Sequence, residues 1–193
     1  LTAFEKIRIF FFWIKVVVVS LFQRKRNGEI LILEYGADEP GQIKYLLEMA
    51  RPEIGIVTAI GDIPAHLEFW SGPEAITREK SKVVEVLTAY GFAVLNADDE
   101  TVSEMKSRTR AKVITFGFGE EGDLRIMNYE IKEQDGRPFG ISFKLSYGGS
   151  VVPVILRGAF GKAHAYAAAL GACVGLIFDL NLVEISEALR SHY

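Results

Sequence analysis

The run Ile54-Gly-Ile-Val-Thr58 decides the fold together with the three segments that follow it. These are the loop Gly61-Asp-Ile-Pro-Ala-His66-Leu-Glu68, a helical pattern over Pro73–Tyr90, and the run Phe92-Ala-Val-Leu95, which leads into Asn96-Ala-Asp-Asp99. Short continuous apolar strands that alternate with helices are typical of a parallel α/β sheet, buried on both faces. The stretch therefore predicts two neighbouring parallel strands with polar residues at their carboxyl ends.

The same alternation extends to both sides of this stretch and predicts a mostly parallel sheet over residues 29–116. Upstream, Glu29–Glu34 is expected as a strand and Gly41–Ala50 as a helix opened by a Pro-Gly turn. Downstream, Asp99–Ser107 is expected as a short helix and Lys112–Phe116 as the fourth strand. The fold class is therefore α/β.

From Gly117 onward the pattern changes to a small antiparallel appendage over residues 117–160, followed by helices over 161–193. Asp135-Gly136 and Gly148-Gly149 are typical hairpin turns. The segments expected between and after these turns are the strands Leu124–Lys132, Phe139–Tyr147 and Val151–Leu156 and the helices Lys162–Phe178 and Leu182–Arg190. Residues 29–193 are thus expected to form one compact domain, preceded by an apolar helix and a basic linker over residues 1–28.

Composition limits the classes of function. The chain has 193 residues, of which 49% are hydrophobic and 24% charged, and its net charge of −3 disfavours nucleic acid as a partner. The single cysteine, Cys173, excludes an intrachain disulfide framework, and its Ala/Gly-rich surroundings favour a small core residue over a nucleophile. No signal-peptide pattern is present, so we expect a cytoplasmic protein, and we expect a monomer.

The segment Ile7–Phe22 is intensely apolar and is followed by the basic Gln23-Arg-Lys-Arg26. A membrane-spanning helix needs about 20 mostly uncharged residues, whereas this run is shorter and contains Arg8 and Lys15. A helix packed on the sheet is the first interpretation, and membrane association is not expected. A membrane-surface helix with a basic flank and a true membrane span remain as alternatives.

Residues able to do chemistry follow the predicted strands, at the edge where open α/β sheets bind ligands. Glu34 can hold Mg²⁺, or it caps a helix or is simply solvated. His66 is a candidate metal ligand, phosphate contact or general acid/base. Lys80 lies on the next helix, where lysines are normally solvated. Asp98 and Asp99 are candidates for helix N-caps or for groups that hold a base or ribose.

The turn Gly158-Ala-Phe-Gly161-Lys-Ala-His164 enters a helix, where an anion is favoured, although this motif is weak alone. A Gly-x-x-x-x-Gly-Lys-Ser/Thr phosphate loop is absent from the sequence.

Three ordered motifs together resemble the central ATP-binding domain of the Mur ligases, which form amide bonds in peptidoglycan precursor synthesis. The motifs are Leu33-Glu-Tyr-Gly-Ala-Asp-Glu-Pro-Gly-Gln-Ile43, Ala65-His-Leu-Glu-Phe69 and Asn96-Ala-Asp-Asp99. They are most similar to the branch of the family that adds D-alanyl-D-alanine. The resemblance runs from about Glu29 to Arg190 and implies a phosphate-loop-type central domain that lacks its phosphate loop.

The resemblance also implies cofactors, substrates and roles. The cofactors would be ATP and Mg²⁺, and the substrates a UDP-muramyl-peptide and D-alanyl-D-alanine, joined through an acyl phosphate. Glu34, His66 and Lys80 would be metal ligands, with Lys80 carbamylated and with Lys80 and His66 as the catalytic residues. The nucleotide-binding residues would be Asn96, Asp98, Asp99 and His164.

The chain departs from the family pattern at two places. Leu1–Gln23 stands where the phosphate loop is expected, and the helix entry Gly161–Ala167 lacks the family's two asparagines. In addition, the sequence stops near Tyr193, where the family's C-terminal domain would begin, and the family's N-terminal UDP-binding domain does not precede it. We therefore expect a ligase fragment that is inactive alone. A folylpolyglutamate-type ligase and a non-catalytic scaffold that uses its apolar helix for a membrane or partner are the alternatives.

Overall fold

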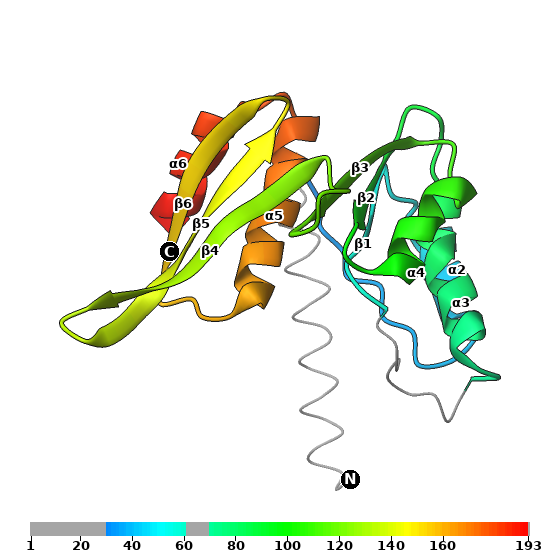
Figure 1. Ribbon diagram of the computed structural model, residues 1–193. Coiled ribbons are helices and arrows are strands. Elements are labelled where there is room, and N and C mark those ends of the chain that lie inside the picture. Colours follow the sequence, from blue (N-terminus) through cyan, green and yellow to red (C-terminus); the bar gives the residue numbers. More distant parts are fainter. Residues whose placement is uncertain (1–29, 61–69, 193) are drawn as a thin grey trace, which may run out of the picture. The chain divides into compact units, whose positions relative to one another are not determined.

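The computed structural model describes residues 30–60 and 70–192, and the chain divides into two units, Leu1–Glu34 and Tyr35–Tyr193. The second unit is built on one sheet of six strands in the order β1-β2-β3-β4-β5-β6 (Figure 1). The strands are β1 (Ile54–Val57), β2 (Phe92–Asn96), β3 (Lys112–Gly117), β4 (Leu124–Gln134), β5 (Arg137–Tyr147) and β6 (Ser150–Arg157).

The sheet is parallel in its first half and antiparallel in its second half, as the sequence predicts. β1, β2 and β3 pair in parallel, with Phe92 opposite both Ile54 and Lys112. β4 continues the sheet in parallel with β3 over only two residue pairs, and it then pairs antiparallel with β5. β5 in turn pairs antiparallel with β6. The predicted appendage is therefore part of the same sheet.

The two hairpin turns that the sequence predicts are confirmed by their backbone angles. Asp135 and Gly136 have φ of 53° and 73°, and Gly148 and Gly149 have φ of 57° and 81°. Positive φ at both central residues is required by the type I′ turn, whose twist matches that of the flanking strands. These turns set the register at the closed end of each hairpin, and the β4–β5 pairing then shifts register twice further along, between Lys132 and Glu133 and between Met127 and Glu130.

Helices cover both faces of the sheet. They are α2 (Gln42–Met49), α3 (Pro73–Glu85), α4 (Glu100–Ser103), the 3-10 helix η3 (Glu104–Arg108), α5 (Lys162–Ile177) and α6 (Leu182–His192). α3 packs on β1 and carries α2 on its outer side, and α4 packs on β2 (Figure 1). α5 contacts β2, β3, β4 and β5, and α6 packs on β6.

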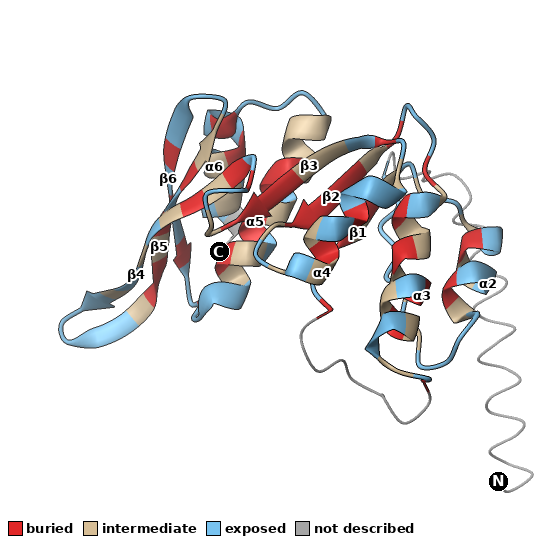
Figure 2. Ribbon diagram, turned by 45° about the vertical axis from the view of Figure 1, so that its right-hand side comes forward, coloured by how far each residue is buried: buried red, intermediate tan, exposed pale blue. Residues whose placement is uncertain are grey.

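Alternate residues of the central strands pack into two separate hydrophobic cores, one on each face of the sheet. Val94 and Phe116 belong to the larger core, beneath α5 and α6. Ala93 and Leu95 belong to the smaller core, together with Val84 of α3 and residues of α4 and η3. Both faces of β2 and β3 are buried, as Figure 2 shows. This explains why these strands are continuous apolar runs in the sequence.

Helix α3 is shorter than the sequence predicts. The pattern favours a helix over Pro73–Tyr90, but α3 ends at Glu85. The residues beyond it form turns, in which the N–H of Gly91 donates to the carbonyl of Thr88 at 3.0 Å. The chain must reverse there to enter β2. Leu87, although fully buried, packs from the irregular segment after the helix.

The predicted strand Glu29–Glu34 is wrong for the described residues, because residues 30–34 adopt no strand. Leu31 and Ile32 are 78% and 88% exposed. An apolar extended segment becomes a strand only when a neighbouring strand pairs with its backbone groups, and sequence pattern alone does not supply that neighbour.

Two further expectations fall on residues outside the described ranges. These are the segment Ile7–Phe22, with the whole of residues 1–28, and the His66 loop. Over residues 30–60 and 70–192, no helix combines the length and the hydropathy needed to span a membrane.

Candidate functional site

Asn96, the last residue of β2, ties the ends of two neighbouring strands together. Its Nδ2 donates to the carbonyl of Thr58, just after β1, at 2.9 Å. Its Oδ1 accepts the N–H of Asp98 at 3.0 Å and so shapes the turn that leaves β2. The side chain is 8% exposed. Asn96 therefore fixes the position of the residues that follow β1 and β2 at the carboxyl edge of the sheet.

Asp99 holds the start of α4 and the loop after β1. Its Oδ1 accepts the N–H of Val102 at 3.0 Å, which is the N-cap geometry that the sequence left open. Its Oδ2 accepts the N–H of Ile60 at 2.8 Å. Both carboxylate oxygens thus bind backbone donors, and they order the chain immediately before the His66 loop.

Asp98 is the central acceptor at this edge. Its Oδ2 accepts the N–H of Phe118 at 2.6 Å and the hydroxyl of Tyr166 at 2.7 Å. Its Oδ1 accepts the N–H of Gly119 at 2.8 Å. One carboxylate therefore joins three segments: the turn after β2, the loop after β3, and α5.

The charge of Asp98 is stabilised by these donors. Partial burial opposes ionisation, but the two backbone N–H groups, the Tyr166 hydroxyl and the nearby Lys162 ammonium hold the pKa of Asp98 below its ordinary value. Burial and the adjacent carboxylate together raise the pKa of Tyr166, so its hydroxyl remains a donor at neutral pH. The link between Asp98 and α5 is therefore a charge-assisted hydrogen bond.

Two aromatic residues and a cation lie beside Asp98, and a third ring packs on one of them. Phe118 makes edge-to-face contacts with Tyr166 and Tyr129, with ring centroids 5.0 and 6.0 Å apart. The Nζ of Lys162, the first residue of α5, lies 4.9 Å from the centroid of Phe118. A nucleobase suits ring faces of this kind, and an anion suits a cation at a helix N-terminus.

Lys80 lies on the core-facing side of α3, which its sequence context did not indicate. Ile76 and Val84, four residues before and after it, are 3% and 0% exposed. Residues four apart share one face of a helix, so the Lys80 side chain runs along this apolar side and is half-buried. In the described part of the chain, Lys80 has no hydrogen-bond or ion-pair partner. It is therefore unlike an ordinary solvated surface lysine.

The other candidate residues are placed only in part. Glu34 is exposed and belongs to the first unit, Leu1–Glu34. His66 lies outside the described residues. His164 is in the first turn of α5, half-buried, close to Lys162 in sequence. Within residues 30–60 and 70–192, no group of three or more His, Cys, Asp or Glu residues is arranged to hold a metal ion.

Sequence reasoning missed Phe118, Tyr166 and Glu79. Tyr166 follows Lys162 by four residues and so shares its face of α5, a spacing visible in the sequence. Phe118 comes directly after β3, at the same edge as Asn96. Glu79 gave no signal, because its partner Ile43 lies on another helix, 36 positions earlier in the chain.

A groove lies elsewhere in the described part of the chain, between the C-terminal halves of α2 and α3. Its volume is about 530 Å³, and it is lined by Lys44, Leu47, Glu48, Arg51, Lys82, Glu85 and Val86. α3 connects the carboxyl end of β1 to the amino end of β2. Its C-terminal half, which lines the groove, therefore lies towards the amino ends of the strands, whereas Asp98 lies at their carboxyl ends. The groove takes no part in the candidate site.

Comparison with known proteins gives a consistent family. A family model described as the Mur ligase middle domain matches residues 14–173. A UDP-N-acetylmuramoyl-tripeptide–D-alanyl-D-alanine ligase from Mycobacterium leprae is 36% identical over 100 residues, covering 52% of this chain and 19% of the relative. A UDP-N-acetylmuramate–L-alanine ligase from Aquifex aeolicus is 27% identical over 165 residues, covering 85% of this chain and 34% of the relative.

Solved structures share the fold. The MurF ligase from Thermotoga maritima, crystallised with ADP, superposes with a TM-score of 0.71 at 24% identity, over 84% of this chain and 36% of that chain. A MurF structure from Acinetobacter baumannii gives a TM-score of 0.68 at 24% identity, over 80% and 32% of the two chains. This chain thus spans between 19% and 36% of the length of these four proteins.

Proposed function

Because this chain belongs to the Mur ligase family, we propose that it is the ATP-binding part of a ligase that forms an amide bond on a UDP-muramyl-peptide. The observation that carries the proposal is the group of side chains around Asp98, which consists of Phe118, Lys162 and Tyr166. Within the family-matched region, it brings ring faces, a cation and a helix N-terminus to the carboxyl edge of β2 and β3. Open α/β sheets bind their ligands at this edge.

In this proposal the nucleotide lies against the loop after β3 and the start of α5. Phe118 and Tyr166 offer ring faces for the base, while Lys162 and the N-terminus of α5 offer positive charge. His164, in the same turn of α5, is a further proposed contact.

Asn96, Asp98 and Asp99 take part chiefly by holding the loops that shape this surface. Asn96 bonds the carbonyl of Thr58, Asp99 accepts the N–H of Val102, and Asp98 accepts the hydroxyl of Tyr166.

For Mg²⁺ we propose Glu34, His66 and Lys80 as the ligands. Mg²⁺ prefers oxygen ligands, so the ammonium form of Lys80 does not fit. A carbamate on its amine does fit, because it presents carboxylate-like oxygens. A bound Mg²⁺ would neutralise charge that develops on the transferred phosphoryl group. The half-buried position of Lys80 between Ile76 and Val84 supports a role other than surface solvation.

We further propose D-alanyl-D-alanine as the incoming amine. The relative from Mycobacterium leprae, whose name includes this dipeptide, shares 36% of residues over 100 positions. The L-alanine ligase from Aquifex aeolicus matches a longer stretch at 27% identity, so L-alanine is the competing amine. Both reactions consume ATP and a UDP-linked precursor, for which the cytoplasm is the proposed location.

Calorimetric titration with ATP, with and without Mg²⁺, tests the nucleotide site. We would use this chain and a version extended upstream in its gene. Lys162→Met should weaken binding by roughly tenfold, the effect of losing one charge-assisted contact, while Lys106→Met on η3 should leave it unchanged. Absence of binding by both chains would contradict the proposal. Phosphate release by the extended chain with D-alanyl-D-alanine or L-alanine then identifies the amine.

A further inference from the structure

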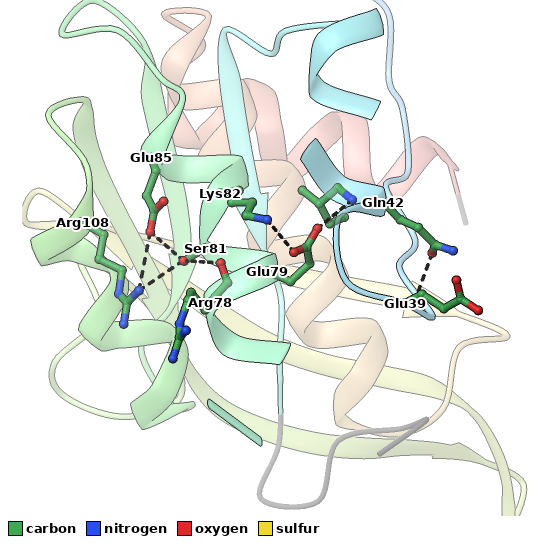
Figure 3. Close-up of polar contacts among 9 residues, drawn as sticks. Glu39, Gln42, Arg78, Glu79, Ser81, Lys82, Glu85 and Arg108 are labelled. Carbon is green, nitrogen blue, oxygen red and sulfur yellow. Dashed lines mark hydrogen bonds and ion pairs between the residues drawn. The ribbon is translucent and has the colours of Figure 1, made fainter. Parts of the chain in front are cut away.

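Glu79 is a buried carboxylate on α3 that reaches across to α2. It is 4% exposed, and its Oε1 accepts the N–H of Ile43 at 3.0 Å (Figure 3). Its Oε2 binds the Nζ of Lys82 at 2.6 Å. The backbone of Gly41 also donates a hydrogen bond to this carboxylate. Glu79 therefore caps α2 from outside, at a helix start that has no acidic residue and no capping side chain of its own.

A second buried residue anchors α3 on another side. Ser81 is fully buried, and its Oγ donates to the Oε1 of Glu85 at 2.7 Å (Figure 3). The Nη1 of Arg108, in η3, lies 3.4 Å from the same Oγ. α3 is thus attached to α2 through Glu79 and to η3 through Ser81, the two residues that flank Lys80 in the chain.

These attachments restrict rotation of α3 about its own axis. Successive residues of an α-helix point about 100° apart. When Glu79 is held against the start of α2, the direction of Lys80 is therefore set along the side of Ile76 and Val84. Apolar contacts by themselves tolerate sliding and rotation far better than a hydrogen bond to a fixed backbone N–H.

We propose that Glu79 is a positioning residue that sets the direction of the Lys80 amine. The inference rests on the proposed function, in which Lys80 belongs to the reaction site. Glu79 itself contacts Ile43, Gly41 and Lys82, and it acts on the site only through the orientation of α3.

Lysine acetylation under native conditions, followed by mass spectrometry, tests the positioning directly. The measured quantity is the labelling rate of Lys80 relative to Lys106. Glu79→Gln should raise this ratio roughly three- to tenfold, the range that loss of one hydrogen bond produces in a local equilibrium. Glu74→Gln, the same change on the same helix at an exposed residue of its first turn, should leave it unchanged. If Glu79→Gln does not fold, Glu79→Asp, which shortens the reach by one methylene, should raise the ratio by a smaller factor.

A second measurement tests the link to the reaction site. Glu79→Gln should raise the half-saturating Mg²⁺ concentration for ATP binding and leave Mg²⁺-free ATP binding unchanged. In a Lys80→Met background it should have no further effect, because Glu79 acts through Lys80. A merely structural role would lower stability and leave this cycle additive.

Equal Lys80 labelling in the Glu79→Gln and Glu74→Gln variants would overturn the positioning role. If Lys80→Met leaves Mg²⁺-dependent ATP binding intact, the proposed role of Lys80 as a metal ligand is wrong. The labelling experiment would still decide whether Glu79 positions Lys80.

Discussion

The hydroxyl of Tyr166 donates a 2.7 Å hydrogen bond to Oδ2 of Asp98, 68 positions earlier in the chain. The same carboxylate accepts the N–H groups of Phe118 and Gly119. The carboxyl edge of the central strands and the start of α5 are therefore joined at a single side chain.

Removing the hydroxyl tests this link. Tyr166→Phe keeps the ring contacts with Phe118 and loses only the donor, so the free energy of unfolding should fall by about 1.5–3 kcal/mol, the range for hydrogen bonds to charged groups. Denaturant unfolding with an unchanged m-value would measure it. Tyr129→Phe is the matched control, since the Tyr129 ring also makes an edge-to-face contact with Phe118. Equal losses in the two variants would show that the hydroxyl of Tyr166 contributes nothing specific.

Acid should weaken the same link. The pKa of Asp98 is held below its ordinary value of 3.8 in the folded protein. Its charge therefore contributes stability that is present above pH 3.8 and is lost as the pH falls below that value. Asp98→Asn should lower stability at pH 7 and make it less steeply dependent on pH between pH 5 and the acid limit. Parallel stability curves for the two proteins would exclude Asp98 as a source of the acid sensitivity.

Gly117 leaves room for the Asp98 carboxylate. A Cβ at Gly117 would lie 2.6 Å from Oδ1 of Asp98, so Gly117→Ala should cost about 1–3 kcal/mol, as overpacking typically does. The control is Gly171→Ala on the exposed side of α5, where a Cβ meets nothing within 4 Å. That change should stabilise the helix by about 0.5–1 kcal/mol. Thermal unfolding of the two variants should thus shift in opposite directions, and a shared direction would contradict the close approach.

Cys173 should be inert in the folded protein. Burial, together with the charge of Asp123, raises the pKa of its thiol to about 12. Because the thiolate is the reactive form, a chromogenic disulfide reagent should react slowly with the native chain and rapidly after unfolding in guanidinium chloride. A fast, stoichiometric reaction without denaturant would contradict the buried position of Cys173 on α5.

Strand and turn positions were largely predictable, because their determinants are local. β1, β2 and β3 are short apolar runs, and the two hairpin turns need residues that tolerate positive φ. The end of α3 was not predictable. Helical periodicity continues beyond Glu85, but the chain must turn there to enter β2. Tertiary packing overrode the local pattern.

The location of the candidate site was predictable from the sequence, but the hydrogen-bond partners of its residues were not. Asn96, Asp98 and Asp99 follow a strand, which predicts a place at the carboxyl edge of the sheet. Their partners Thr58, Ile60, Phe118 and Tyr166 lie between 20 and 68 positions away. Hydrogen bonds over such separations depend on which strands become neighbours.

Local sequence thus determined the α/β class, the parallel order of β1 to β3, the hairpin register of β4 to β6, and the family motifs. Only the tertiary structure decided that Asp98 is an acceptor shared by three segments and that Lys80 lies on the apolar side of α3 beside a buried Glu79. The physical reason is that periodicity and turn chemistry act over a few residues. The environment of a polar side chain is instead set by which distant backbone groups folding brings within hydrogen-bond reach.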